Sequence, residues 1–88
     1  MTDYPAAHAF SSRHREQLER DRLCGCFHCL AIYAPSEIKR WLKEPGGGET
    51  ALCPRCGIDA VIGESAGYPI TEEFLSMMHV RWFSSRLL

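Results

Sequence analysis

The chain has 88 residues, which predicts one domain (1–88) whose small core needs a disulfide or a metal as a staple. Hydrophobic residues make up 45% of the chain and charged residues 24%, values that exclude wholesale disorder. The formal net charge of −1 argues against a partner bound mainly through phosphates, because such proteins carry a clear basic excess.

The N-terminal part predicts a tail and then a helix. We expect residues 1–8 to be loose, and residues 9–23 to form a helix with alternating charges. Its apolar stripe is thin, with Phe10, Leu18 and Leu23 as its members. Such a helix is not stable alone, so it is expected to lie across the core or to serve as a contact arm.

Short strands and one short helix are expected in the middle of the chain. Residues 30–33, 50–52 and 58–62 read as strands, and Gly46-Gly47-Gly48 as a loop. Pro35 stands where a helix can begin, and Ile38, Trp41 and Leu42 follow at the spacing of one helical face. We therefore predict a short helix between Pro35 and the glycine loop.

A helix is also predicted near the C-terminus, within residues 70–86. Thr71 is a suitable N-cap, and Ile70 and Leu75 stand at the two positions of a hydrophobic staple. Apolar residues then recur at helical spacing, which indicates a helix packed on a small core.

Four cysteines form two pairs with metal-ligand spacing, Cys26-x-x-Cys29 and Cys53-x-x-Cys56. Two residues between cysteines let one tight turn aim both sulfurs at a single point, and Gly57 tolerates a positive φ after the second pair. Four sulfur ligands are the usual set of a structural zinc site, so we expect one Zn²⁺ per chain. Such a site leaves no open coordination position, which argues against zinc catalysis.

These two pairs resemble the knuckles of zinc-ribbon and rubredoxin-like proteins. Cys53-Pro54-Arg55-Cys56-Gly57 matches that pattern fully, whereas Leu30 stands where the first knuckle commonly has glycine. The resemblance covers residues 24–64 and implies a small α+β zinc ribbon with short antiparallel strands, stabilised by the metal. It implies no single function. The whole chain also resembles small bacterial cytoplasmic proteins of uncharacterised activity.

The fifth cysteine and His28 lie at the first pair in the sequence, whereas His79 lies in the predicted C-terminal helix. Cys24 is interpreted as a buried auxiliary thiol, and a redox role together with Cys26 is the sharper alternative. His28 is expected to be a neighbour of the site or an exposed residue rather than a ligand, and His79 a surface or packing residue rather than a base. No nucleophile with a base, and no phosphate loop, stands out, so we expect no enzyme and no small-molecule substrate.

We expect a protein that acts by binding another protein in the reducing cytoplasm. The candidate interface consists of aromatic and basic residues favoured at protein contacts: Tyr33, Trp82, Phe83 and Arg86. The first alternative is a nucleic-acid-binding, transcription-related zinc ribbon, with phosphate contacts from Arg13, Arg15, Arg20, Arg22, Lys39, Arg40, Lys43 and Arg55. The second is an iron or thiol redox protein.

Overall fold

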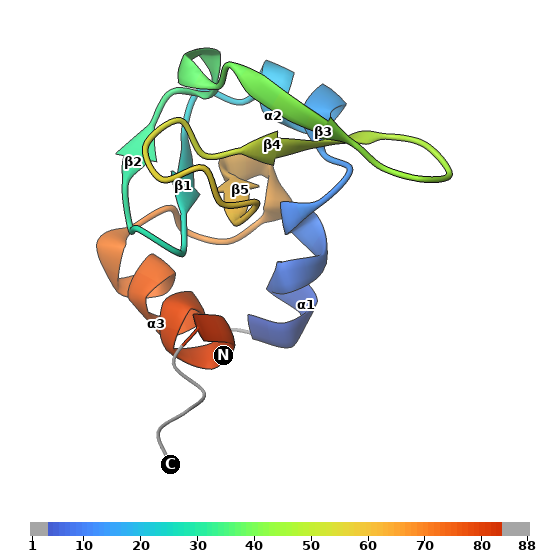
Figure 1. Cartoon of the computed structure of the whole chain (residues 1–88). Coiled ribbons are helices and arrows are strands. Elements are labelled where there is room, and N and C mark those ends of the chain that lie inside the picture. The colour runs from blue at the N-terminus through green and yellow to red at the C-terminus, as the bar shows by residue number, and fades with distance from the viewer. Residues whose placement is uncertain (1–3, 84–88) are drawn as a thin grey trace.

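Short runs of strand-forming residues pair into two small antiparallel sheets in the computed structural model, which describes residues 4–83 (Figure 1). One sheet has the order β2-β1-β5, where β1 is Cys24–Cys26, β2 is Ile32–Tyr33 and β5 is Val61–Gly63. The other is a hairpin of β3 (Arg40–Lys43) and β4 (Glu49–Leu52), which projects from the body of the molecule (Figure 1). Helices lie before and after these sheets, so the expected small α+β class is confirmed.

The predicted helix over residues 9–23 is wrong as a single element. The chain instead forms α1 (Tyr4–His8), a 3-10 turn (Ala9–Ser11) and α2 (Arg15–Arg20). Helical geometry breaks at Arg13, whose φ is 50°, because its amide donates to Thr50 Oγ1 at 2.9 Å instead of to the preceding turn. A hydrogen bond across 37 positions therefore overrides a helical sequence pattern.

The expected loose tail over residues 1–8 is also wrong where the structure describes it. Residues 4–8 form α1, and Ala7 on this helix is fully buried. Tyr4 stacks on Phe74 of the last helix with 6.0 Å between ring centroids. These contacts hold α1 beside α3 (Glu72–Phe83) at one end of the molecule (Figure 1). Residues 1–3 lie outside the described part.

The short helix predicted between Pro35 and the glycine loop is limited to one 3-10 turn, Pro35–Glu37. Trp41 and Leu42 lie in β3, where Trp41 is opposite Ala51 of β4. The three glycines form the hairpin turn, all with positive φ, and the Glu44 amide donates to the Gly48 carbonyl. Pairing with β4 therefore outweighs the helical spacing of the apolar residues.

The C-terminal helix forms as its caps predict. The Phe74 amide donates to Thr71 Oγ1 at 3.1 Å, and the two staple residues, Ile70 and Leu75, are both buried. They pack against Gly25 of β1, where an added Cβ would lie 2.7 Å from the Leu75 side chain. Glycine at this position therefore allows α3 to approach the sheet that carries the first cysteine pair. Residues 84–86 of the predicted helix lie outside the described part.

The core lies between the three-stranded sheet, α2 and α3. Its largest fully buried side chains include Phe27, Leu18, Ile62, Leu75 and Met78. Within residues 4–83, no helix has the length and apolar character that crossing a membrane requires. The sheet and α3 thus provide a rigid frame for the turn that follows β1.

Candidate metal centre

The two cysteine pairs occupy two tight turns that the sheets bring face to face. Cys26 ends β1 and begins the first turn, while Cys53 directly follows β4 and begins the second. The Phe27 amide donates to the Ala60 carbonyl at 2.9 Å, which ties the first turn to the chain that leaves the second. The predicted pairs therefore meet although residues 30–52 separate them in the sequence.

All four sulfurs lie within 4.8 Å of one another. The Cys26–Cys56 and Cys29–Cys53 sulfur pairs are each 3.7 Å apart. This is too long for a disulfide, whose sulfurs are about 2 Å apart. A tetrahedral metal with bonds of about 2.3 Å to sulfur requires edges of about 3.8 Å between sulfurs. The cluster thus has the size of a single four-sulfur metal site, and the described residues contain no other group with this potential.

Backbone amides in both turns point at the sulfurs. His28 N–H donates to Cys26 Sγ, and Arg55 N–H donates to Cys53 Sγ, each at 3.3 Å. Hydrogen bonds of this kind stabilise the thiolate over the thiol. The backbone of each knuckle, rather than its side chains, therefore prepares the sulfur for a cation.

The surrounding protein shifts the pKa of three cluster thiols: Cys26, Cys53 and Cys56. Burial raises the pKa of Cys26 and that of Cys56. Burial also acts on Cys53, but the nearby Tyr33 hydroxyl and hydrogen bonds from backbone amides outweigh it and lower the pKa of Cys53 to about 7. A group of thiolates this close together needs a bound cation, because uncompensated buried charges cost several kcal/mol each. The donor set, four sulfurs and no oxygen, suits a soft or borderline metal such as zinc.

Tyr33 is the functional residue whose role the sequence did not indicate. It was predicted to lie at an interface, and this is wrong because the side chain is only 4% exposed. Its buried hydroxyl makes no hydrogen bond of standard geometry, but it faces the Cys53 sulfur closely enough to favour a thiolate there. Only the fold shows this role, because Tyr33 is opposite Cys24 in the β1–β2 pairing and far from Cys53 in the sequence.

Cys24 is a buried thiol outside the cluster, as interpreted from the sequence. Its sulfur donates to the Tyr33 carbonyl at 3.4 Å, and burial raises its pKa to about 12. A neutral, buried and hydrogen-bonded thiol is a poor nucleophile. The four-sulfur site thus excludes Cys24 even though Cys26 is only two residues away.

The first knuckle is covered by the end of α3. His79 Nδ1 donates to the Phe27 carbonyl at 3.1 Å, and Phe83 packs edge-on against the His28 ring at 4.8 Å between centroids. Four aromatic rings therefore lie close together at this knuckle: Phe27, His28, His79 and Phe83. Neither histidine belongs to the four-sulfur cluster. His28 is a neighbour of the site, as expected, and His79 is a packing residue whose contact with the first knuckle the sequence did not indicate. Trp82 and Phe83 remain 37% and 40% exposed, whereas Arg86 lies outside the described residues.

No protein-family model, no curated protein and no solved structure matches this chain. The resemblance to zinc ribbons therefore rests on the two cysteine turns themselves. Their sulfur geometry supports a zinc-ribbon-like metal site.

Proposed function

We propose that the chain is a structural-zinc protein of the cytoplasm that acts by binding another protein and not by catalysis. The observation that carries this proposal is the attachment of the exposed aromatic end of α3 to the first knuckle. Through His79 and Phe83, the metal site fixes the place of a half-exposed aromatic pair, Trp82 and Phe83. Rigid aromatic residues with part of their surface open to solvent are typical anchors of protein interfaces.

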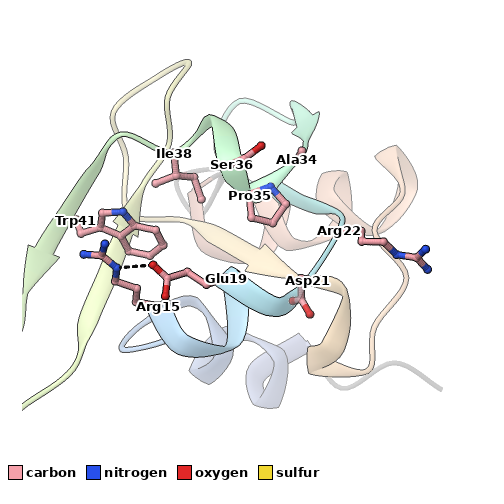
Figure 2. A pocket seen from close by; sticks show the side chains of 9 residues that line it. All are labelled: Arg15, Glu19, Asp21, Arg22, Ala34, Pro35, Ser36, Ile38 and Trp41. Atoms are coloured by element: carbon pink, nitrogen blue, oxygen red, sulfur yellow. Dashed lines mark hydrogen bonds and ion pairs between the residues drawn. The ribbon is translucent and has the colours of Figure 1, made fainter.

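The geometry of the metal site supports a structural role for zinc. All four corners of the cluster are protein sulfurs, so a bound ion has no position left for water or substrate. A cavity beside α2 offers no alternative catalytic site. It measures about 520 Å³, and its carboxylates are engaged. Glu19 pairs with Arg15 (Figure 2), and Asp21 accepts from Ser65. No histidine, cysteine or lysine lines it, so its one hydroxyl, on Ser36, has no free base.

Nucleic-acid binding is the alternative, because Lys39, Arg40 and Arg55 line a hollow beside the second knuckle. Two observations weigh against it. Arg55 already pairs with Glu37 at 2.9 Å, and a divalent ion with four thiolates carries a net charge of −2 beside these cations. Arg15 is also engaged, since it pairs with Glu19 and stacks on Trp41 at 4.7 Å (Figure 2) and also pairs with Glu49. The local charge is thus close to balanced.

Elemental analysis and partner capture test the proposal together. We expect one zinc per chain and a colourless protein, since an iron-loaded redox centre is coloured. The double variant Phe83→Ala/Arg86→Ala should capture less partner protein while zinc content and helical signal stay constant. Leu42→Ala, a change of a residue 45% exposed on β3, is the matched control and should not affect capture. Metal-free native protein would overturn the zinc proposal. Binding of oligonucleotides at micromolar concentration and physiological salt, unaffected by the double variant, would favour the alternative.

A further inference from the structure

The outer side of α3 exposes two large apolar side chains on adjacent turns. Its inner side buries Phe74, Leu75 and Met78, yet Met77 and Val80 on the other side are 48% and 53% exposed. A helix on the surface of a monomer normally presents polar residues outward, and one that is apolar on both sides is normally covered on both. Single exposed apolar residues need no explanation, but two on adjacent turns of one helix face do.

Charged residues border these apolar ones in a self-complementary order. Glu73, Met77 and Arg81 follow one another at four-residue spacing, so they lie along one side of the helix. We call this side, with Val80, the outer face of α3. Met77 lies midway between the acidic and the basic residue. If two copies of α3 pair antiparallel about a two-fold axis at Met77, each Glu73 meets Arg81 of the second copy.

The surface around Met77 also has room for a partner side chain. One hollow of about 480 Å³ is lined by Glu72, Glu73, Ser76 and Met77. Within residues 4–83, neither Glu73 nor Arg81 forms an ion pair, so both charges are available. Arg81 is held near its place by stacking on Trp82, with its guanidinium carbon 5.4 Å from the ring centroid.

We infer that the outer face of α3 is a self-association surface through which two copies of this chain pair their helices antiparallel. This goes beyond the proposed function, because it uses residues other than the aromatic pair at the end of the helix. The helix is about 18 Å long, so the contact is smaller than the roughly 800 Å² per partner of a stable interface. The dimer is therefore weak and reversible, forming in the micromolar range or above.

Sedimentation equilibrium of the zinc-loaded protein over a wide concentration range tests this inference. Met77→Glu places two carboxylates at the two-fold axis and should leave only monomer. Leu42→Glu is the control, since it adds the same charge at a residue of similar exposure on β3, and should leave the dimer unchanged. A wild-type protein that is monomeric at millimolar concentration overturns the inference. So does a Met77→Glu variant that dimerises normally. A monomeric wild type that Met77→Glu destabilises would show that the chain itself covers this face.

A charge swap tests the antiparallel geometry independently of folding. Glu73→Arg and Arg81→Glu should each weaken self-association by about tenfold, because each brings like charges together twice. An equimolar mixture of the two variants should restore wild-type affinity, because both charge pairs are then opposite in sign. The same chains are measured alone and mixed, so an effect of either change on helix stability cancels. Absence of recovery in the mixture overturns the antiparallel pairing.

Discussion

The two knuckles hold their sulfurs with the same backbone hydrogen bonds but stand in different surroundings. In the first, the Leu30 amide donates to the Cys26 carbonyl at 2.7 Å, and in the second the Gly57 amide donates to the Cys53 carbonyl at 2.9 Å. The residues after the turns both have positive φ, 68° for Leu30 and 81° for Gly57. This conformation favours glycine, so the first knuckle adopts the knuckle geometry despite its leucine.

The residues between the cysteines differ more than the turns themselves. Phe27 is fully buried and His28 packs under α3, whereas their counterparts Pro54 and Arg55 are exposed. The intervening residues of the first knuckle therefore pack on the core, while those of the second lie at the surface, although Cys29 is exposed and Cys53 is buried. The comparison teaches that the cysteine sulfurs and the backbone amides of the turn form the metal site. The two intervening side chains are therefore free to connect that site to the rest of the fold.

Loss of any one cysteine ligand should have the largest effect on metal binding and folding. The effect should be equal in the two knuckles. Cys26→Ser and Cys53→Ser should each abolish metal binding and unfold the domain, because structural zinc supplies on the order of 10 kcal/mol in small metal-folded domains. Elemental analysis and circular dichroism measure both effects. The control is Cys24→Ser, which changes a buried thiol outside the cluster and should keep its zinc. Zinc loss in Cys24→Ser, with retention in Cys26→Ser, would mean that the first knuckle uses Cys24.

Replacing the second residue of each knuckle by alanine should lower the free energy of unfolding much more in the first knuckle than in the second. Phe27→Ala should lower the free energy of unfolding by about 3–5 kcal/mol, because it removes a large side chain that is 1% exposed. Pro54→Ala at the equivalent, exposed position should cost less than about 1 kcal/mol. Urea denaturation in saturating zinc measures both. Equal losses at the two positions would contradict the distinction between a core knuckle and a surface knuckle.

Features set by local sequence could be predicted, and features set by distant contacts could not. The cysteine turns and the Thr71 cap depend on residues within a few positions of one another, so their spacing was sufficient. The break at Arg13 depends on Thr50, and β3 forms because β4 pairs with it. Tyr33 was misjudged for the same reason, since an aromatic residue in a short strand gives no sign of which side the core will lie on.

The backbone conformation of the residue that follows each cysteine turn should have a smaller effect on stability. Gly57→Ala should destabilise the protein by about 1 kcal/mol, because alanine is strained at a φ of 81° although its Cβ has room, with Arg40 Nη2 3.9 Å away. Leu30→Gly relieves the same strain in the first knuckle but removes a side chain packed on the core, so it should be close to neutral. Thermal melting of the zinc-loaded variants distinguishes these results. A Gly57→Ala variant as stable as wild type would show that strain in the two turns is not comparable.

The smallest expected effect concerns the hydroxyl group that favours one sulfur over the others. Both Cys26 and Cys53 accept an amide of their own turn, but only Cys53 also faces the Tyr33 hydroxyl. Tyr33→Phe keeps the buried ring and removes that group, so the pKa of Cys53 should rise from about 7 toward its ordinary value. A more basic thiolate takes up protons more readily, and protons compete with the metal for the sulfur. As the pH is lowered, the variant should therefore release zinc at a pH a few tenths of a unit higher than wild type, since a hydroxyl near a thiolate contributes no more than the roughly 1 kcal/mol of a full hydrogen bond. A metal-indicator dye added during an acid titration measures the midpoint.

The control is Tyr68→Phe, which removes the hydroxyl of a tyrosine that stacks on Phe74, and should leave the midpoint unchanged. A midpoint for Tyr33→Phe that equals wild type, or lies below it, would show that the backbone amides alone determine how firmly each knuckle holds its thiolates.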